Sequence, residues 1–143
     1  MPGLFAYADD ETKKNILELA VLIVDDQQEI RMLVRDILME AGVTRVFEAA
    51  NGREALGLLA AGFDVINFVI SDWNMPGLPG IDFLRRVRAA YPDMPFLMIT
   101  GRNDKNSVID AKGAGVSAYI RKPFSPRQLE EKMKALLSKK PGA

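Results

Sequence analysis

The feature that most constrains this chain is a fivefold alternation between short apolar runs and longer segments with a helical spacing of apolar residues. Continuous apolar runs are typical of parallel strands buried on both faces, because a strand with one exposed face alternates apolar and polar residues. The runs therefore predict strands at residues 20–24, 46–49, 65–71, 96–100 and 118–121.

The segments between these runs predict helices. Apolar residues spaced i, i+3, i+4 and i+7 mark one helical face over 30–41, and Gly42 stands where a C-terminal cap belongs. Asn51 with Glu54, and Ser125 with Gln128, each match a capping box at a helix start. Strands and helices that alternate in this way predict an α/β fold, with one parallel sheet and helices on both of its faces. The predicted helices cover 30–41, 51–62, 81–91, a weaker 105–114, and a last segment that begins at Pro126.

The domain organisation follows from the same pattern. Residues 1–18 are mostly polar and are predicted to form an N-terminal extension that is partly mobile or a short helix. Residues 19–143 contain no low-complexity linker, which predicts one domain. Nothing in the chain resembles a signal peptide or a membrane span, so we expect a soluble, cytoplasmic monomer without membrane insertion.

Composition excludes several kinds of chemistry. The 143 residues contain no cysteine and no histidine, which removes thiolate nucleophiles, imidazole bases and the usual transition-metal ligands. The 19 basic and 19 acidic residues balance, so the chain as a whole has no charge that favours nucleic acid as a partner. Arg85, Arg86 and Arg88 form a local basic cluster, which is typical of a solvated helix face.

Five polar residues stand where predicted strands end. In parallel sheets the functional crevice lies beyond the carboxyl ends of the strands, so these side chains are expected to converge at one edge. Their separations along the chain form no short motif and make sense only as one strand end per repeat. The residues are Asp25 and Asp26 after the first strand, Asp72 after the third, Thr100 after the fourth and Lys122 after the fifth.

The charges of this set predict a bound cation. Three carboxylates and one ammonium leave two net negative charges, and close carboxylates raise one another's pKa unless a cation lies among them. Mg²⁺ suits such a site because it binds through a few carboxylates and keeps other positions for water and phosphate oxygens. Phosphoryl transfer needs mainly positioning and charge neutralisation, so the sequence predicts an Mg²⁺-dependent phosphoryl acceptor with a carboxylate nucleophile.

Four segments together resemble the signature of response-regulator receiver domains, and most closely the single-domain, CheY-like chemotaxis regulators. The resemblance covers roughly residues 19–139 and implies a flavodoxin-like sheet with strand order 2-1-3-4-5. All four segments occur in order, each on the expected strand, which makes the match specific. They are Val24-Asp25-Asp26, Ser71-Asp72-Trp73-Asn74-Met75-Pro76, Ile99-Thr100-Gly101 and Lys122-Pro123-Phe124.

The resemblance also implies roles for residues. Asp72 would be the phosphoacceptor, supplied by a sensor histidine kinase or a small phosphodonor, while Lys122 and Thr100 would contact the phosphoryl group. Thr100 and Tyr119 would then switch the face formed by the helix at 105–114, the strand at 118–121 and the last helix, which would bind a downstream target such as a flagellar motor switch. Such a protein is not an enzyme beyond its own phosphorylation and slow dephosphorylation. The implied Mg²⁺ ligands are Asp25, Asp26, Asp72 and the backbone carbonyl of Asn74.

Some details depart from the family pattern, and rival functions stay open at this point. Pro79 stands where relatives often carry an acidic residue, and Asn74 and Arg102 occupy positions that tune phosphoryl lifetime in the family. One rival is a phosphorelay shuttle to a histidine phosphotransfer protein. Another is a haloacid-dehalogenase-like phosphatase, although its Asp-x-Asp signature is missing because Asp25 and Asp26 are adjacent. A scaffold with a degenerate site is disfavoured because every site residue is present.

Overall fold

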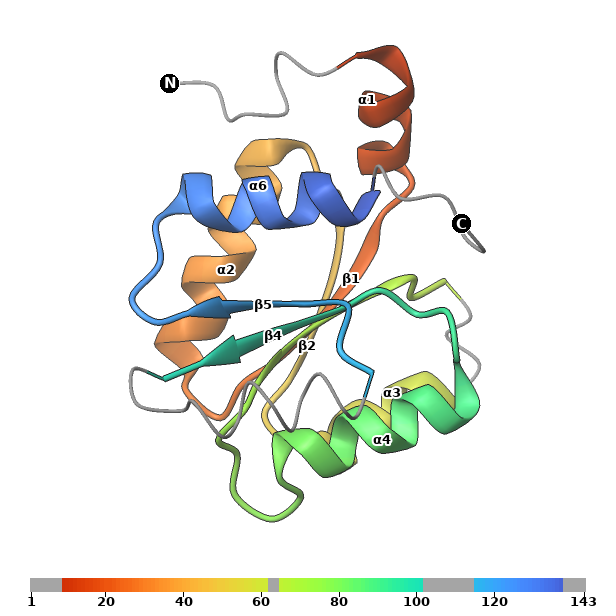
Figure 1. Cartoon of the computed structure of the whole chain (residues 1–143), viewed down its shortest axis with the longest axis vertical. Helices are drawn as coiled ribbons and strands as arrows, with labels where there is room; N and C mark the ends of the chain where they lie inside the picture. Colours follow the sequence, from red (N-terminus) through yellow and green to blue (C-terminus); the bar gives the residue numbers. More distant parts are fainter. Residues whose placement is uncertain (1–8, 62–64, 102–114, 138–143) are drawn as a thin grey trace.

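The protein folds around one five-stranded parallel sheet (Figure 1). A computed structural model describes residues 9–61, 65–101 and 115–137. The strands lie in the order β2-β1-β3-β4-β5, which confirms the predicted fold class and topology. The strands are β1 (Ala20–Val24), β2 (Arg45–Ala49), β3 (Phe68–Asp72), β4 (Phe96–Thr100) and β5 (Ala118–Arg121).

Helices cover both faces of the sheet (Figure 1). The first group lies on one face and contains α1 (Asp10–Leu17), α2 (Gln28–Ala41) and α6 (Pro126–Leu137). The second group lies on the opposite face and contains α3 (Gly52–Ala60) and α4 (Gly80–Ala90). No helix among the described residues is both long and apolar enough to cross a membrane.

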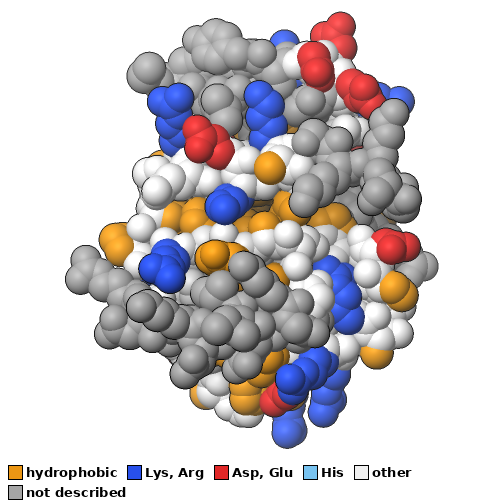
Figure 2. All heavy atoms as spheres, in the orientation of Figure 1, with side chains coloured by type: hydrophobic (Ala, Val, Ile, Leu, Met, Phe, Trp, Pro, Cys, Tyr) orange, Lys and Arg blue, Asp and Glu red, His pale blue; other side chains and the backbone are white. Residues whose placement is uncertain are grey.

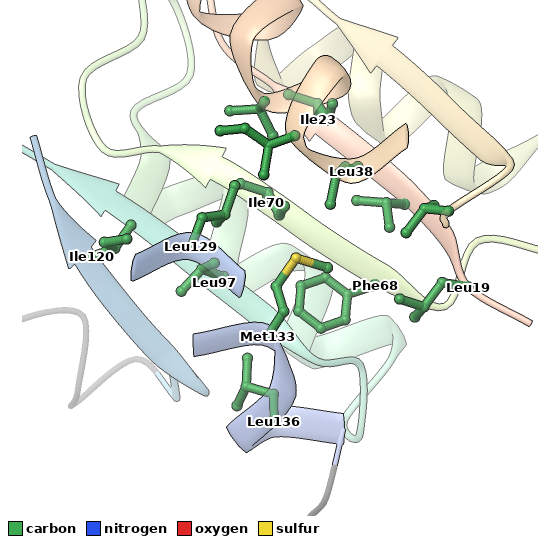
Figure 3. Packing of buried hydrophobic residues seen from close by; sticks show 14 of the residues in the cluster. Leu19, Ile23, Leu38, Phe68, Ile70, Leu97, Ile120, Leu129, Met133 and Leu136 are labelled. Carbon is green, nitrogen blue, oxygen red and sulfur yellow. The ribbon is translucent and has the colours of Figure 1, made fainter. Parts of the chain in front are cut away.

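Each central strand contributes side chains to two separate cores, which explains why its apolar run is continuous. In β1, Ile23 packs toward α2 and α6, whereas Leu22 packs toward α3 and α4. Figure 3 shows the first core, where Met133 of α6 lies against Phe68 of β3. Because alternate residues of one strand enter opposite cores, both faces of the central strands β1, β3 and β4 are buried.

The N-terminal extension contains a helix that packs on the domain. Ile16 and Leu19 are 3% exposed and belong to the first core. The backbone carbonyl of Glu18 accepts hydrogen bonds from Arg45 (2.7 Å) and from the side-chain amide of Asn67 (2.9 Å). The segment just before β1 is therefore tied to β2 and to the residue that precedes β3.

The predicted helix caps are present. Gly42 has φ 109°, the left-handed conformation that favours glycine at a helix end. The Asn51 side chain accepts a hydrogen bond from the Glu54 amide at 2.8 Å. Ser125 and Gln128 exchange both bonds of a capping box, at 2.8 and 3.1 Å.

One predicted strand boundary and the predicted solvation of one side chain were wrong, and one predicted helix lies outside the described residues. The third strand was predicted from Val65, but β3 begins at Phe68, which pairs with Val21 of β1. Just before it, the Ala20 amide donates to the side chain of Asn67 (2.9 Å) rather than to a backbone carbonyl, so the ladder does not extend further. Arg88 is not solvated as predicted: its guanidinium donates to Gly115 O (2.6 Å), Met94 O (2.6 Å) and Ser117 Oγ (3.0 Å). The helix predicted at 105–114 falls among the residues that the structure does not describe.

Candidate phosphorylation site

The register of the sheet aligns the strand ends that carry the candidate residues. Val24, the last residue of β1, pairs with Ser71 of β3, so Asp25 and Asp72 follow side by side. Thr100, the last residue of β4, pairs with Arg121 of β5, and Lys122 comes next. Since all strands are parallel, these residues lie at one edge of the sheet, as predicted.

Three carboxylates and one ammonium form the centre of the site. Asp25, Asp26 and Asp72 each place one carboxylate oxygen within 4.8 Å of the others. Nζ of Lys122 lies 3.4 Å from Oδ1 of Asp72 and 3.8 Å from Oδ2 of Asp25. Asp25 and Asp72 are buried, whereas Asp26 is exposed.

Burial and mutual repulsion make this site unfavourable for negative charge. Burial, followed by the nearby carboxylate of Asp25, raises the pKa of Asp72 to about 6, although Lys122 acts in the opposite direction. Burial is also the main reason why the pKa of Asp25 is raised, and the amide of Gln27, which donates to Oδ1 at 2.9 Å, offsets part of this shift. A positive ligand would relieve both carboxylates.

The donor set fits a hard divalent cation. Oδ2 of Asp25 is buried, and no group among the described residues donates a hydrogen bond to it. An unsatisfied buried carboxylate oxygen costs free energy, and a cation held between carboxylates removes that cost. The cluster offers oxygen ligands only, which is the chemistry of Mg²⁺ rather than of a soft transition metal.

The remaining predicted site residues are placed as follows. Thr100 is fully buried, with Oγ1 3.5 Å from the carbonyl of Ile120, and its own carbonyl accepts from the Lys122 amide at 2.8 Å. Tyr119 is half-buried in the second core, and the ammonium of Lys132 lies 5.7 Å from its ring centroid. Asn74 is exposed, two residues after Asp72. Arg102 lies outside the described residues.

Two residues that sequence reasoning did not assign to the site also shape it. A Cβ on Gly80 would lie 2.5 Å from the carbonyl oxygen of Asp72 and 2.6 Å from that of Trp73, so only glycine fits there. Its amide donates to the Trp73 carbonyl at 3.0 Å. Arg31 donates to the carbonyl of Asp25 at 2.6 Å. The position of Gly80 at a predicted helix start is the sequence signal that could have indicated its role. Nothing in the spacing of Arg31 indicates its contact with Asp25.

Known proteins resemble this chain over most of its length. A family model for the response regulator receiver domain matches residues 21–134. The chemotaxis protein CheY of Pseudomonas aeruginosa is 40% identical over 124 residues, which span 85% of this chain and 98% of that protein. A CheY homolog of Campylobacter jejuni is 41% identical over 121 residues, or 83% of this chain and 92% of the relative.

Solved structures agree with these matches. The chemotaxis protein CheY4 of Vibrio cholerae has a TM-score of 0.75 and 34% identity, and the match covers 82% of this chain and 98% of that one. The haloacid-dehalogenase and phosphorelay-shuttle alternatives are not favoured by these matches. The chain therefore belongs to the response regulator receiver domain family.

Proposed function

We propose that Asp72 accepts a phosphoryl group and that the protein works as a CheY-type signalling switch. The observation that carries this proposal is the placement of Lys122 between two buried carboxylates, 3.4 Å from Asp72 and 3.8 Å from Asp25. An ammonium there attracts the anionic oxygens of an incoming phosphoryl group, while the Asp72 carboxylate lies next to it as the nucleophile.

The reaction balances with the groups present. An Oδ atom of ionised Asp72 forms a bond to phosphorus while the bond from phosphorus to the donor's leaving atom breaks. The electron pair of the broken bond leaves with the donor atom, which takes up a proton from solvent, and Asp72 becomes an acyl phosphate. Attack of water on phosphorus later releases inorganic phosphate and restores the carboxylate. A phosphohistidine of a sensor kinase, or a small phosphodonor, supplies the group.

Mg²⁺ is the proposed cofactor, held by the carboxylates of Asp25, Asp26 and Asp72 and by the backbone carbonyl of Asn74. When bound, it neutralises the charge that develops on the phosphoryl oxygens. The chain itself supplies Lys122 for the same charge, and Thr100, whose hydroxyl at the end of β4 is the proposed hydrogen-bond donor to the phosphorylated state. Asn74 and Arg102 are proposed to set the lifetime of the acyl phosphate.

The proposed output surface is the face that includes β5 and α6. Figure 2 shows hydrophobic side chains between these elements, with basic side chains nearby. Movement of Thr100 toward the phosphoryl group would shift Tyr119, which lies on the adjacent strand opposite Met98. Two relatives are named chemotaxis proteins, so we infer a target in a chemotaxis-type pathway and a cognate histidine kinase as the input.

The acceptor is tested by intact-protein mass after incubation with a small phosphodonor. We expect one added phosphoryl group in the wild type with Mg²⁺, and none with a chelator or in Asp72→Asn. The control Asp36→Asn changes an exposed carboxylate on α2 and should be modified like the wild type. Modification of Asp72→Asn to the wild-type extent would place the acceptor elsewhere.

The output is tested by affinity capture with and without beryllofluoride, an analogue of the phosphoryl group. A switch requires that the analogue change the affinity for a target, because a ligand without differential affinity shifts no population. Capture of a motor-switch protein would support the chemotaxis role, whereas phosphoryl transfer to a histidine phosphotransfer protein would replace it with a relay role.

A further inference from the structure

The backbone of Asp25 is held on each side by a different partner. Its amide donates to the carbonyl of Ala49 at 3.1 Å, continuing the contact between β1 and β2. Its own carbonyl lies beyond Val24, the last paired residue of β1, so the sheet ladder does not satisfy it. A buried carbonyl needs another donor, and the side chain that supplies it fixes the orientation of the peptide that leads to Asp26.

Arg31 supplies that donor from the first turn of α2. Its Nη1 lies 2.6 Å from the Asp25 carbonyl oxygen, and its Nε lies 3.3 Å from Oε1 of Glu48 on β2. Its side chain is only 17% exposed, so water does not readily replace these contacts. The planar guanidinium therefore ties the end of β1 to β2 with two directed bonds, a geometry that a flexible ammonium does not provide.

Arg35 provides a natural comparison. It lies one helical turn later and also pairs with Glu48, through Nη1 at 3.0 Å from Oε2. Its side chain is 48% exposed, and its hydrogen bond is to Glu48 rather than to the loop after β1. The two arginines thus carry the same charge near the same carboxylate, but Arg31 alone of this pair bonds to the peptide between Asp25 and Asp26.

We propose that Arg31 is a positioning residue of the phosphorylation site, which holds the Asp25–Asp26 peptide so that both carboxylates face Asp72. The proposal rests on the function proposed above. It concerns the geometry of the cation ligands, because rotation of this peptide would turn Asp26 away from the other two oxygens of the cluster.

Geometry and charge predict opposite effects when Arg31 is replaced. Removal of a positive charge near an acidic cluster should tighten binding of a divalent cation, because the site becomes more negative. Loss of the bond that orients the peptide should weaken binding, because the ligands are then no longer preorganised. The sign of the change in Mg²⁺ affinity therefore separates a positioning role from a purely electrostatic one.

The experiment compares Arg31→Met with Arg35→Met in the full chain, since methionine keeps an unbranched apolar stem. Mg²⁺ is titrated into each protein and followed by the amide NMR shifts of Asp26 and Gln27 and by the fluorescence of Trp73, the single tryptophan. We expect Arg31→Met to bind Mg²⁺ about tenfold more weakly, the effect of losing one charge-assisted hydrogen bond. Arg35→Met should stay within about twofold of the wild type.

Hydrogen exchange without metal gives a second readout. The Asp26 amide should exchange faster in Arg31→Met than in Arg35→Met, after correction for the global stability of each variant from urea unfolding. Unchanged or tighter Mg²⁺ binding by Arg31→Met, with the wild type binding normally, overturns the positioning role and leaves the proposed function standing. Failure of the wild type itself to bind Mg²⁺ overturns the proposed metal site, and the inference with it.

Discussion

Replacement of Asp72 by asparagine should stabilise the folded protein at neutral pH. The Asp72 side chain is 7% exposed, and burial together with Asp25 raises its pKa from 3.8 to about 6. Each unit of pKa corresponds to about 1.4 kcal/mol, so the ionised group costs the folded state about 3 kcal/mol. Asparagine removes the charge at nearly constant volume, and the pKa of about 6 already includes the opposing attraction of Lys122. The buried amide of asparagine adds two donors that need acceptors, which offsets part of the gain. We expect a net stabilisation of about 2 kcal/mol.

The pH dependence has a definite sign. A carboxyl whose pKa is higher in the folded than in the unfolded state costs nothing below the unfolded pKa of 3.8, where it is protonated in both states. The cost grows between pH 3.8 and about 6 and is constant above that range. The free energy of unfolding of Asp72→Asn should therefore exceed that of the wild type at pH 8 and converge with it near pH 4.

Urea unfolding followed by far-ultraviolet circular dichroism, at several pH values in the presence of a chelator, measures this difference. Circular dichroism is preferable to fluorescence because Trp73 adjoins the mutated residue. Asp36→Asn is the matched control, since it makes the same substitution at an exposed carboxylate on α2, away from the site. Added Mg²⁺ should stabilise the wild type more than the variant and so narrow the gap.

Two results would refute this reasoning. If Asp72→Asn is less stable than the wild type at pH 8 without metal, the ion pair with Lys122 outweighs the cost of burial. If the difference between the two proteins does not change from pH 4 to pH 8, the pKa of Asp72 is not raised in the folded state.

Two further substitutions test the framework around the site. Gly80→Ala should destabilise the protein by about 2 kcal/mol and slow phosphorylation, because the new Cβ would lie 2.5 Å from the Asp72 carbonyl oxygen. Gly57→Ala, in open space on α3, should instead stabilise the protein by about 0.5–1 kcal/mol. Equal effects of the two substitutions in thermal melts would contradict the close approach at Gly80. Arg88→Met should cost about 2–3 kcal/mol in urea unfolding, because it leaves half-buried acceptors without their donor, and a change below about 0.5 kcal/mol would show that the site is solvated.

The sequence predicts this fold well because the central strands β1, β3 and β4 are buried on both faces. A continuous apolar run such as residues 96–100 has few alternative structures, and β4 spans those residues. The apolar pattern fails to predict where the third strand begins. Val65 is 44% exposed and precedes β3, because backbone pairing with β1, which starts at Phe68, decides where that strand begins.

The candidate site is predictable to the same degree and for a related reason. Polar residues at the ends of the first, third, fourth and fifth apolar runs are visible in the sequence, and the parallel register brings Asp25, Asp72 and Lys122 together. The contacts that hold these ends are not visible in the sequence. The bond from Arg31 to the Asp25 carbonyl depends on the direction of one side chain across the gap between a helix and a strand, which residue spacing does not specify.

The buried charges of Asp72 and Arg88 have opposite effects on the stability of this domain. Burial shifts the pKa of both groups toward the neutral form. The guanidinium of Arg88 donates hydrogen bonds to acceptors of the fold, which compensate for its burial, so the loss of Arg88 should destabilise the protein. Asp72 lies among other carboxylates, and within the described part of the chain only the ammonium of Lys122 pairs with it, so its charge opposes folding until a cation neutralises it. A ligand that neutralises Asp72 removes this cost, so we expect cation binding at this site to stabilise the folded domain.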